Sequence, residues 1–299
     1  MMLQNREIRR LRDRLNVSWM IVILAIVLFL PLLLGLGLFV QSGLLLKELS
    51  IWNVLFTSQW MPMSGKFGLL SFILSSLMVT VLSLLIACPV CLLTAIHLTQ
   101  YAKRYVLNIM HPVIDILAGI PSVIYGVWGI LAVVPLVSKY IAPLFGVQTS
   151  GYTLLAGAIV LAIMIIPFIL NILIEVFRSI PTELTEASLA LGATRWQTIK
   201  FVILRKGFPG IISALGLGIS RAFGETIAVL MVVGNVAKIP TGIFQPGYPL
   251  PALIANNYGE MMSIPMYQSA LMFSALVLFV IVMLFNLASR IAITKFETK

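Results

Sequence analysis

Residues 179–197 read SIPTELTEASLALGATRWQ and separate two apolar runs, at about 152–176 and 209–234. Each run exceeds the roughly 20 residues that a helix needs to cross about 30 Å of bilayer hydrocarbon. Because backbone polar groups in lipid must be bonded within their own segment, both runs are predicted to be helices. The polar stretch is therefore expected to be a loop that connects two membrane spans.

The connecting loop has the start and stop signals of helices. Pro181 suits the first turn of a helix, where its missing N–H is not needed. Glu183 and Glu186 lie in the early turns, where a carboxylate interacts favourably with the helix dipole. Gly192 suits the position just past a helix end, and residues 194–197 match a capping box that opens another helix. The loop is therefore predicted to form two short helices joined by a tight turn.

The whole chain has the composition of a membrane protein. It is 60% apolar and 10% charged, whereas soluble domains carry about 25% charged residues. The first apolar run is too long for a cleaved signal peptide and is expected to be an anchor helix. Within the third run, residues 119–122 read GIPS, which predicts a kink or break. Six runs qualify as spans and predict an all-α integral membrane protein: about 17–41, 68–98, 112–138, 152–176, 209–234 and 267–290.

The distribution of Lys and Arg predicts the orientation of these spans. Alternate loops hold fifteen of these residues against four in the other loops, with Arg221 left inside a span. Basic loops stay in the cytosol, so both termini are expected there, and the net charge of +10 indicates topology rather than nucleic-acid binding. Outside, residues 44–56 are expected to form an interfacial helix, and 235–266 an irregular cap. The predicted divisions are 1–16 (basic cytosolic terminus), 17–41 (anchor), 42–66 (external segment), 67–290 (transmembrane domain with the connecting loop 177–208) and 291–299 (cytosolic tail).

A charged pair is predicted inside the fifth span. Arg221 would lie near the membrane midplane, where an arginine costs roughly 2.5–3.5 kcal/mol. Glu225 follows four residues later, so on a helix the two share a face and can bond directly. They could form a structural ion pair or a polar station on the path of an anion. The second interpretation is favoured, because intramembrane charges are usually functional and a guanidinium offers a planar fork of N–H donors to an anion. Asp115 and Glu175 are expected near the headgroups, without a role in transport.

The helix that opens at Pro181 exposes alanine and leucine side chains to water. It could dock a partner protein, or it could pack on the membrane or on neighbouring loops. A DNA-binding helix-turn-helix is a poor interpretation, because the loop is too short to reach a groove.

Catalytic chemistry is not indicated anywhere in the chain. There is no G-x-x-x-x-G-K-[ST] loop for nucleotide phosphates, and no nucleophile elbow or H-E-x-x-H helix. Cys88 and Cys91 have redox-motif spacing, but within a lipid-embedded run cysteine serves as a small apolar side chain. The sequence therefore predicts no catalytic residue, no cofactor and no metal ion, and a membrane-embedded enzyme is disfavoured.

Two sets of motifs resemble a known family. Glu186-Ala187-Ser188 followed by Gly192 resembles the EAA loop of ABC importer permeases, although Arg205 stands where that family has a proline. Over about residues 52–290, the stretches AGIPSVIYG (118–126), ALGATRW (190–196) and RAFGETIAVLM (221–231) are similar to the C-type permease subunits of phosphate importers.

This resemblance implies a type I ABC importer permease in a bacterial inner membrane. Its partners would be a homologous A-type permease, two ATP-binding subunits and an extracytoplasmic phosphate-binding protein. The loop would be a coupling helix docked on the ATPase, and Arg221 and Glu225 would act in transport. A secondary transporter or channel for an oxyanion is the alternative, but it would not need the two-helix loop. The residues implied in coupling are Glu183, Glu186, Ala187, Leu191 and Gly192.

Overall fold

The computed structural model describes residues 2–297, with side chains described over 12–295 except at 104. Four basic side chains that support the predicted orientation, those of Arg6, Arg9, Arg10 and Arg104, therefore lie outside the described side chains, and Lys299 lies outside the described residues. Six helices in the described chain are long and apolar enough to cross a membrane, which confirms the predicted fold class and span count.

Helices dominate the described chain, and one small hairpin of β1 (Trp60–Met61) and β2 (Lys66–Phe67) was not predicted. The spans are formed by α1 (Met2–Gln41), α4 (Leu70–Ile96), α6 (Ser122–Trp128) with the segments that continue it to Leu144, α9 (Leu154–Arg178), α11 (Arg195–Thr198) continuing into α12 (Leu204–Gly224), and α15 (Pro265–Glu297). The shorter helices include α2 (Gly43–Glu48), α3 (Ile51–Phe56), α5 (Arg104–Gly119), α8 (Ala142–Leu144), α10 (Thr182–Ala190), α13 (Ile227–Leu230) and α14 (Leu250–Asn257).

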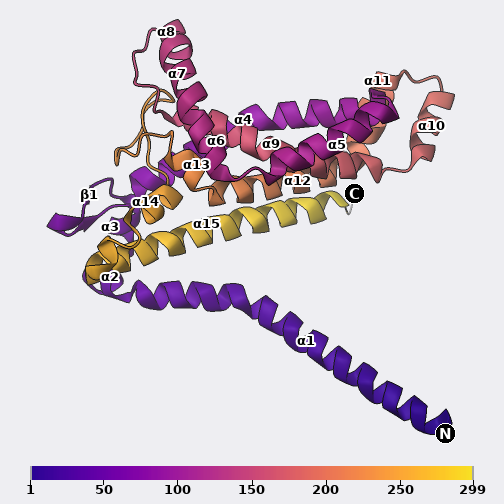
Figure 1. Cartoon of the computed structure of the whole chain (residues 1–299), viewed down its shortest axis with the longest axis horizontal. Helices are drawn as coiled ribbons and strands as arrows, with labels where there is room; N and C mark the ends of the chain where they lie inside the picture. Colours follow the sequence, from indigo (N-terminus) through magenta and orange to yellow (C-terminus); the bar gives the residue numbers. More distant parts are fainter. Residues whose placement is uncertain (1, 298–299) are drawn as a thin grey trace.

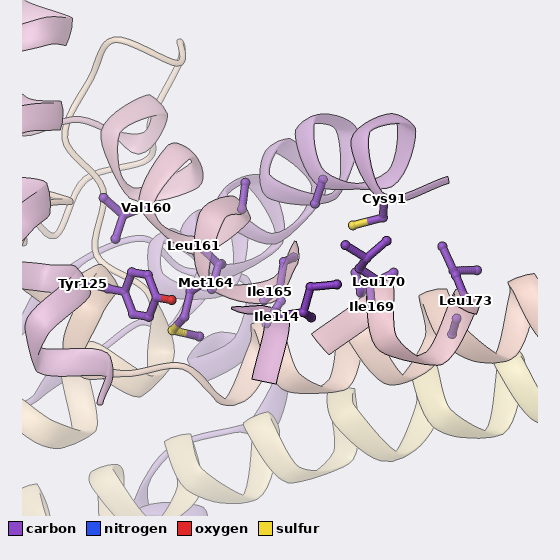
Figure 2. Close-up of a cluster of buried hydrophobic side chains, with 14 of the residues drawn as sticks. Cys91, Ile114, Tyr125, Val160, Leu161, Met164, Ile165, Ile169, Leu170 and Leu173 are labelled. Atoms are coloured by element: carbon purple, nitrogen blue, oxygen red, sulfur yellow. The ribbon is translucent and has the colours of Figure 1, made fainter. Parts of the chain in front are cut away.

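The central element of the bundle is α9, which packs against α4, α5 and α12. Its apolar side chains point in several directions, and two-thirds of its most apolar window is buried inside this one chain. Figure 2 shows Leu161, Ile165 and Ile169 from this helix packed beside Ile114 of α5 and Cys91 of α4. A helix that is apolar on all sides is expected at the core of a membrane bundle, so α9 is the frame on which the other spans are positioned.

The third span is broken where the sequence predicts. Helix α5 ends at Gly119, Ile120 and Pro121 are extended, and α6 begins at Ser122. The predicted limits 112–138 are nevertheless wrong, because the span-length helical segment runs over Ser122–Leu144 and α5 is a separate apolar helix. Proline disfavours a helical conformation at the residue before it, so the chain restarts its helix after Pro121 and the span moves towards the C-terminus.

The fifth span also has different limits. A continuous helical segment runs from Arg195 to Gly224, although 209–234 was predicted. The helix ends at Gly224 because Glu225 is extended, and only the short α13 follows. The predicted loop 177–208 is correspondingly shorter, since α9 continues to Arg178 and the next span already begins at Arg195.

The two ends of the bundle carry different structures (Figure 1). Helices α10 and α11 lie at one end, and both chain termini are directed towards it, whereas α2, α3, α14 and the hairpin lie at the other end. The predicted interfacial helix over 44–56 is instead two short helices, α2 and α3. The predicted irregular cap over 235–266 contains α14 and a 3-10 turn, and is otherwise irregular.

Serines on the spans hold the cap in place. The hydroxyls of Ser75 and Ser76 on α4 accept hydrogen bonds from the backbone N–H groups of Tyr248 (3.1 Å) and Leu250 (2.8 Å). Non-helical backbone at membrane depth is tolerated only where its polar groups are satisfied by protein or water. These bonds therefore let the cap pack directly against the transmembrane core.

A glycine pair at the α8 end of the bundle gives a stability prediction. Gly151 has a φ of +89°, and a Cβ there would clash with the Val134 carbonyl oxygen; Gly146 has a φ of +70° but open space around it. Gly151→Ala therefore adds a clash to the roughly 1–2 kcal/mol cost of a left-handed residue, whereas Gly146→Ala incurs only that cost. We expect Gly151→Ala to lower the thermal midpoint of the detergent-purified protein more than Gly146→Ala. Equal shifts would contradict the close approach of Gly151 to Val134.

Candidate functional site

Arg221 lies in the last turn of α12, at the carboxyl end of the fifth span. A cation there interacts favourably with the negative end of the helix dipole. Its guanidinium carbon lies 4.9 Å from the centre of the Phe168 ring on α9, within cation–π range. The side chain is also exposed on this single chain. Among the described side chains, this cation has an aromatic contact and no ion pair.

The break in the third span lies close to this cation. Helix α6, which follows the break, packs against α13, the helix that follows Arg221, and the Tyr125 hydroxyl donates a 2.8 Å hydrogen bond to the Leu117 carbonyl of α5. That bond crosses the break between the two helices and satisfies a carbonyl at a helix end. Figure 2 shows the Tyr125 ring beside Met164 of α9. Two of the stretches quoted from the sequence, 118–126 and 221–231, therefore meet in space.

Glu225 does not share a helix face with Arg221, so the predicted direct pairing is wrong in this structure. The helix ends before Glu225, whose backbone is extended, and its Oε1 accepts a 3.1 Å hydrogen bond from the N–H of Ala228. The carboxylate thereby satisfies an N–H of α13 that has no partner within the helix. Glu225 and Arg221 are both described, and they form no ion pair.

The surroundings of Glu225 explain the separation. It lines a cavity of about 10 Å³ together with Ser76 and Thr80 of α4 and Pro249 of the cap, close to the smallest volume that holds a water molecule. Glu225 thus borders a cavity beside α4 and the cap, whereas the guanidinium of Arg221 lies over Phe168 of α9. The structure therefore presents two separate polar groups in this region.

Helix α10 forms a second site at the opposite end of the fifth span (Figure 1). None of its residues is buried, and Glu183 and Ala187 are exposed. Glu186 lines an open cavity of about 760 Å³ between α10 and the connection of α4 to α5. Leu191, just past the helix end, is 90% exposed. Leu184 and Leu189 of the same helix are exposed as well, and grouped exposed apolar side chains are typical of a protein interaction site.

The end of α10 is a Schellman motif, with Gly192 just past the helix end as predicted. Gly192 has a φ of +84°, its N–H bonds to the Leu189 carbonyl (2.9 Å), and the Ala193 N–H bonds to the Ser188 carbonyl (3.2 Å). This 6→1 and 5→2 pattern satisfies the last carbonyls of the helix. The motif fixes the direction in which Leu191 projects.

The predicted capping box is present at the start of α11. The Thr194 hydroxyl accepts from the Gln197 N–H and the Gln197 side chain accepts from the Thr194 N–H. The helix that it opens is not short, however, because it continues without a break into α12. Arg205, which stands where the resembled family has a proline, and Pro209 both lie within this continuous helical segment.

Ser188 links α10 to this long helix. Its hydroxyl lies 2.9 Å from that of Thr198, which is buried. A polar residue within the otherwise apolar part of α10 was the only sequence signal for this contact. Consequently the exposed helix is bonded to the base of the same helix that carries Arg221 at its far end.

The contact of Arg221 with Phe168 and a polar pair further along α9 were not predicted from the sequence. Phe168 has no distinguishing signal, because it is one apolar residue among many on α9. Asn171 and Asp115 are hydrogen-bonded to each other, with Asn171 Nδ2 donating to Asp115 Oδ1 at 2.9 Å. Both interrupt apolar helices, so a search for polar residues inside spans could have found them.

Known proteins match most of the chain. Residues 87–298 match the model of the family described as "Binding-protein-dependent transport system inner membrane component". The "Phosphate transport system permease protein PstC" of Xylella fastidiosa is 35% identical over 82% of this chain and 79% of its own length. A "Probable ABC transporter permease protein YqgH" of Bacillus subtilis is 37% identical over 96% and 92%. A "Probable phosphate transport system permease protein PstC" of Methanocaldococcus jannaschii is 34% identical over 95% of both chains.

Solved structures match the fold. A bacterial ABC transporter "involved in the import of the acidic polysaccharide alginate" aligns over 94% of this chain and 98% of its own, with a TM-score of 0.61 and 17% identity. The MetNI methionine ABC transporter in an inward-facing conformation aligns over 80% and 99%, with a TM-score of 0.55 and 20% identity. The two transporters are named for different substrates, methionine and alginate. Their similarity to this chain therefore shows the fold alone.

Proposed function

Because the chain belongs to the family of binding-protein-dependent transport system inner membrane components, we propose that it is the permease subunit of an importer for inorganic phosphate. The chain is a multi-pass permease of an ABC importer, and ATP hydrolysis is not its own activity. Family membership implies an ATPase and a binding protein as partners. The choice of phosphate as the substrate comes from the names of several relatives, which are called phosphate transport system permease proteins.

Arg221 is the observation that carries the assignment to an anion. It is an exposed guanidinium at the end of an apolar helix, and it contacts an aromatic ring rather than a carboxylate. A charge in a membrane span must face protein or water rather than lipid. We place it on a water-filled path between this chain and a second, homologous permease of the A type. Its fork of N–H donors suits the oxygens of phosphate.

Glu225 is proposed to act on the same path as a hydrogen-bond acceptor. A bare carboxylate repels an anion, but it accepts a hydrogen bond from a protonated phosphate oxygen. Its bond to the Ala228 N–H orients the carboxylate at the start of α13. Instead of pairing directly, Arg221 and Glu225 would thus act on the anion from separate positions.

Helix α10 is proposed to couple this path to two ATP-binding subunits. Leu191 would enter a groove on the ATPase, with Glu183, Glu186 and Ala187 around it and Gly192 fixing the turn. The Ser188–Thr198 contact would then pass movement of α10 into the helix that ends near Arg221. This requires α10 to be cytosolic, which agrees with the excess of Lys and Arg in the loops on that side. The membrane would be the inner membrane of a bacterium.

The test is uptake of labelled phosphate by the complete complex in proteoliposomes. We expect accumulation that needs both internal ATP and the external phosphate-binding protein, with no accumulation of labelled sulfate. Uptake that continued without ATP or without the ATPase subunits would support the secondary transporter instead. Uptake of another substrate under the same requirements would retain the importer and overturn phosphate.

A further inference from the structure

A second polar group lies along α9 from Arg221, and no role was predicted for it from the sequence. Asp115 of α5 accepts a 2.9 Å hydrogen bond from the amide of Asn171. Asn171 lies on α9 three residues after Phe168, on which Arg221 rests. Residues three apart on a helix are surface neighbours, about 5–6 Å between their Cβ atoms. The α9 residues that contact the guanidinium and the carboxylate are therefore about one helical turn apart, and the residue that contacts Asp115 lies on the α10 side.

The hydrogen bonding around Asp115 is incomplete. The other amide atom of Asn171, Oδ1, is buried and has no hydrogen-bond partner among the described residues, and the same is true of Nε2 of His111. His111 precedes Asp115 by four residues on α5, so the two share a face of that helix. Buried polar atoms are nearly always bonded in folded proteins. Three polar residues with spare capacity thus gather within apolar helices.

We propose that Asp115, oriented by Asn171, is a second charged group on the translocation path, and that it is the partner of Arg221 when the guanidinium leaves the ring of Phe168. The proposal rests on the proposed function, because it assumes that α5, α9 and α12 border the path. Both charged side chains are exposed on this single chain, and an intramembrane charge requires water or a partner. Arg221 can then exchange a cation–π contact for an ion pair with Asp115.

If Arg221 alternates between the ring of Phe168 and the carboxylate of Asp115, a substitution that removes one contact should partly correct the effect of removing the other. Asp115→Asn keeps the size of the side chain and its hydrogen bond but removes the charge, so it favours the ring-bound state. Phe168→Leu keeps an apolar side chain but removes the ring, so it favours the carboxylate-bound state. Each single variant is expected to lower phosphate uptake per complex roughly three- to tenfold, the size of one such contact. The double variant should transport faster than either single variant.

The matched control is Glu175→Gln, which removes an exposed carboxylate near the end of α9 and should leave uptake unchanged. If Asp115 and Phe168 serve only in packing, their effects will combine and the double variant will be slower than both single variants. That result overturns the proposal. Unaltered uptake in Asp115→Asn overturns it as well.

Accessibility gives a second readout that needs no substrate. In the complete complex with Cys88→Ala and Cys91→Ala, a cysteine placed by Asp115→Cys should react with a membrane-impermeant maleimide in at least one nucleotide state. A cysteine placed by Leu85→Cys, at an exposed position on α4, should not react. Equal reactivity at the two positions in every state overturns the location on the path. Labelling does not depend on phosphate. An unreactive cysteine at position 115 would therefore count against the location of Asp115 on the path, whereas absent phosphate uptake by the wild type would count against the proposed function.

Discussion

Replacing Gly192 with valine is expected to release the ATPase subunit from the permease and to abolish uptake. The residue has a φ of +84°, a conformation that costs an L residue roughly 1–2 kcal/mol and is worst for β-branched side chains. No atom lies within 4 Å of a Cβ built there, so the cost is conformational and not steric. The turn would reorganise and redirect Leu191. Retention of the ATPase subunit on the affinity-purified permease should fall at least about tenfold.

Gly146→Val is the control for this experiment. Gly146 also has a positive φ (+70°) and open space around it, but it lies past α8 at the opposite end of the bundle. The backbone penalty is therefore matched while the proposed docking helix is untouched, and the ATPase subunit should stay bound. Equal loss of the subunit in both variants would indicate a general folding defect, and retention in Gly192→Val would remove α10 as the docking element.

Arg221→Gln is expected to reduce phosphate uptake by roughly 30- to 1000-fold, the size of losing one desolvated charged contact. The ATPase subunit should remain bound, because α10 lies at the other end of the helix. The measurement is labelled uptake, normalised to the amount of assembled complex. Normal uptake by Arg221→Gln would leave only a structural role for the cation.

Two substitutions of Glu225 distinguish a role of its charge in transport from a role of its hydrogen bond in the fold, in the same assay. Glutamine at this position can still accept the hydrogen bond from the Ala228 N–H through its amide oxygen, whereas Glu225→Ala leaves that N–H without its partner. If the charge acts in transport, both variants lose uptake. If the carboxylate only caps α13, Glu225→Gln transports normally and Glu225→Ala does not. We expect the first outcome.

Much of the architecture could be predicted because lipid imposes simple rules on a chain. Six apolar runs gave six spans, since a span needs length and hydropathy and little else. The loop around α10 was predicted from local chemistry, and both Gly192 and the capping box at Thr194 have the expected geometry. Helix ends are decided by a few neighbouring residues, so they can be inferred without knowledge of the tertiary structure.

The site near Arg221 could not be predicted in the same way. The shared face assumed for Arg221 and Glu225 required an unbroken helix, and Gly224 was not taken as the end of that helix. Partners on other helices, such as Phe168, are chosen by packing that one sequence does not reveal. The contact of Asp115 with Asn171 could not be predicted either, because it joins positions 56 residues apart.

The unbroken run from Arg195 to Gly224 makes the fifth span a lever. Twenty-six residues separate its foot, beside α10, from Arg221, which is about 40 Å at 1.5 Å per residue. A tilt of about 5° pivoting at that foot would carry the guanidinium roughly 3 Å, comparable to the reach of a hydrogen bond. Because the run stays helical through the π-helical turn at Ile199–Ile203 and through Pro209, a slight rotation driven at its foot would move the guanidinium on the proposed path.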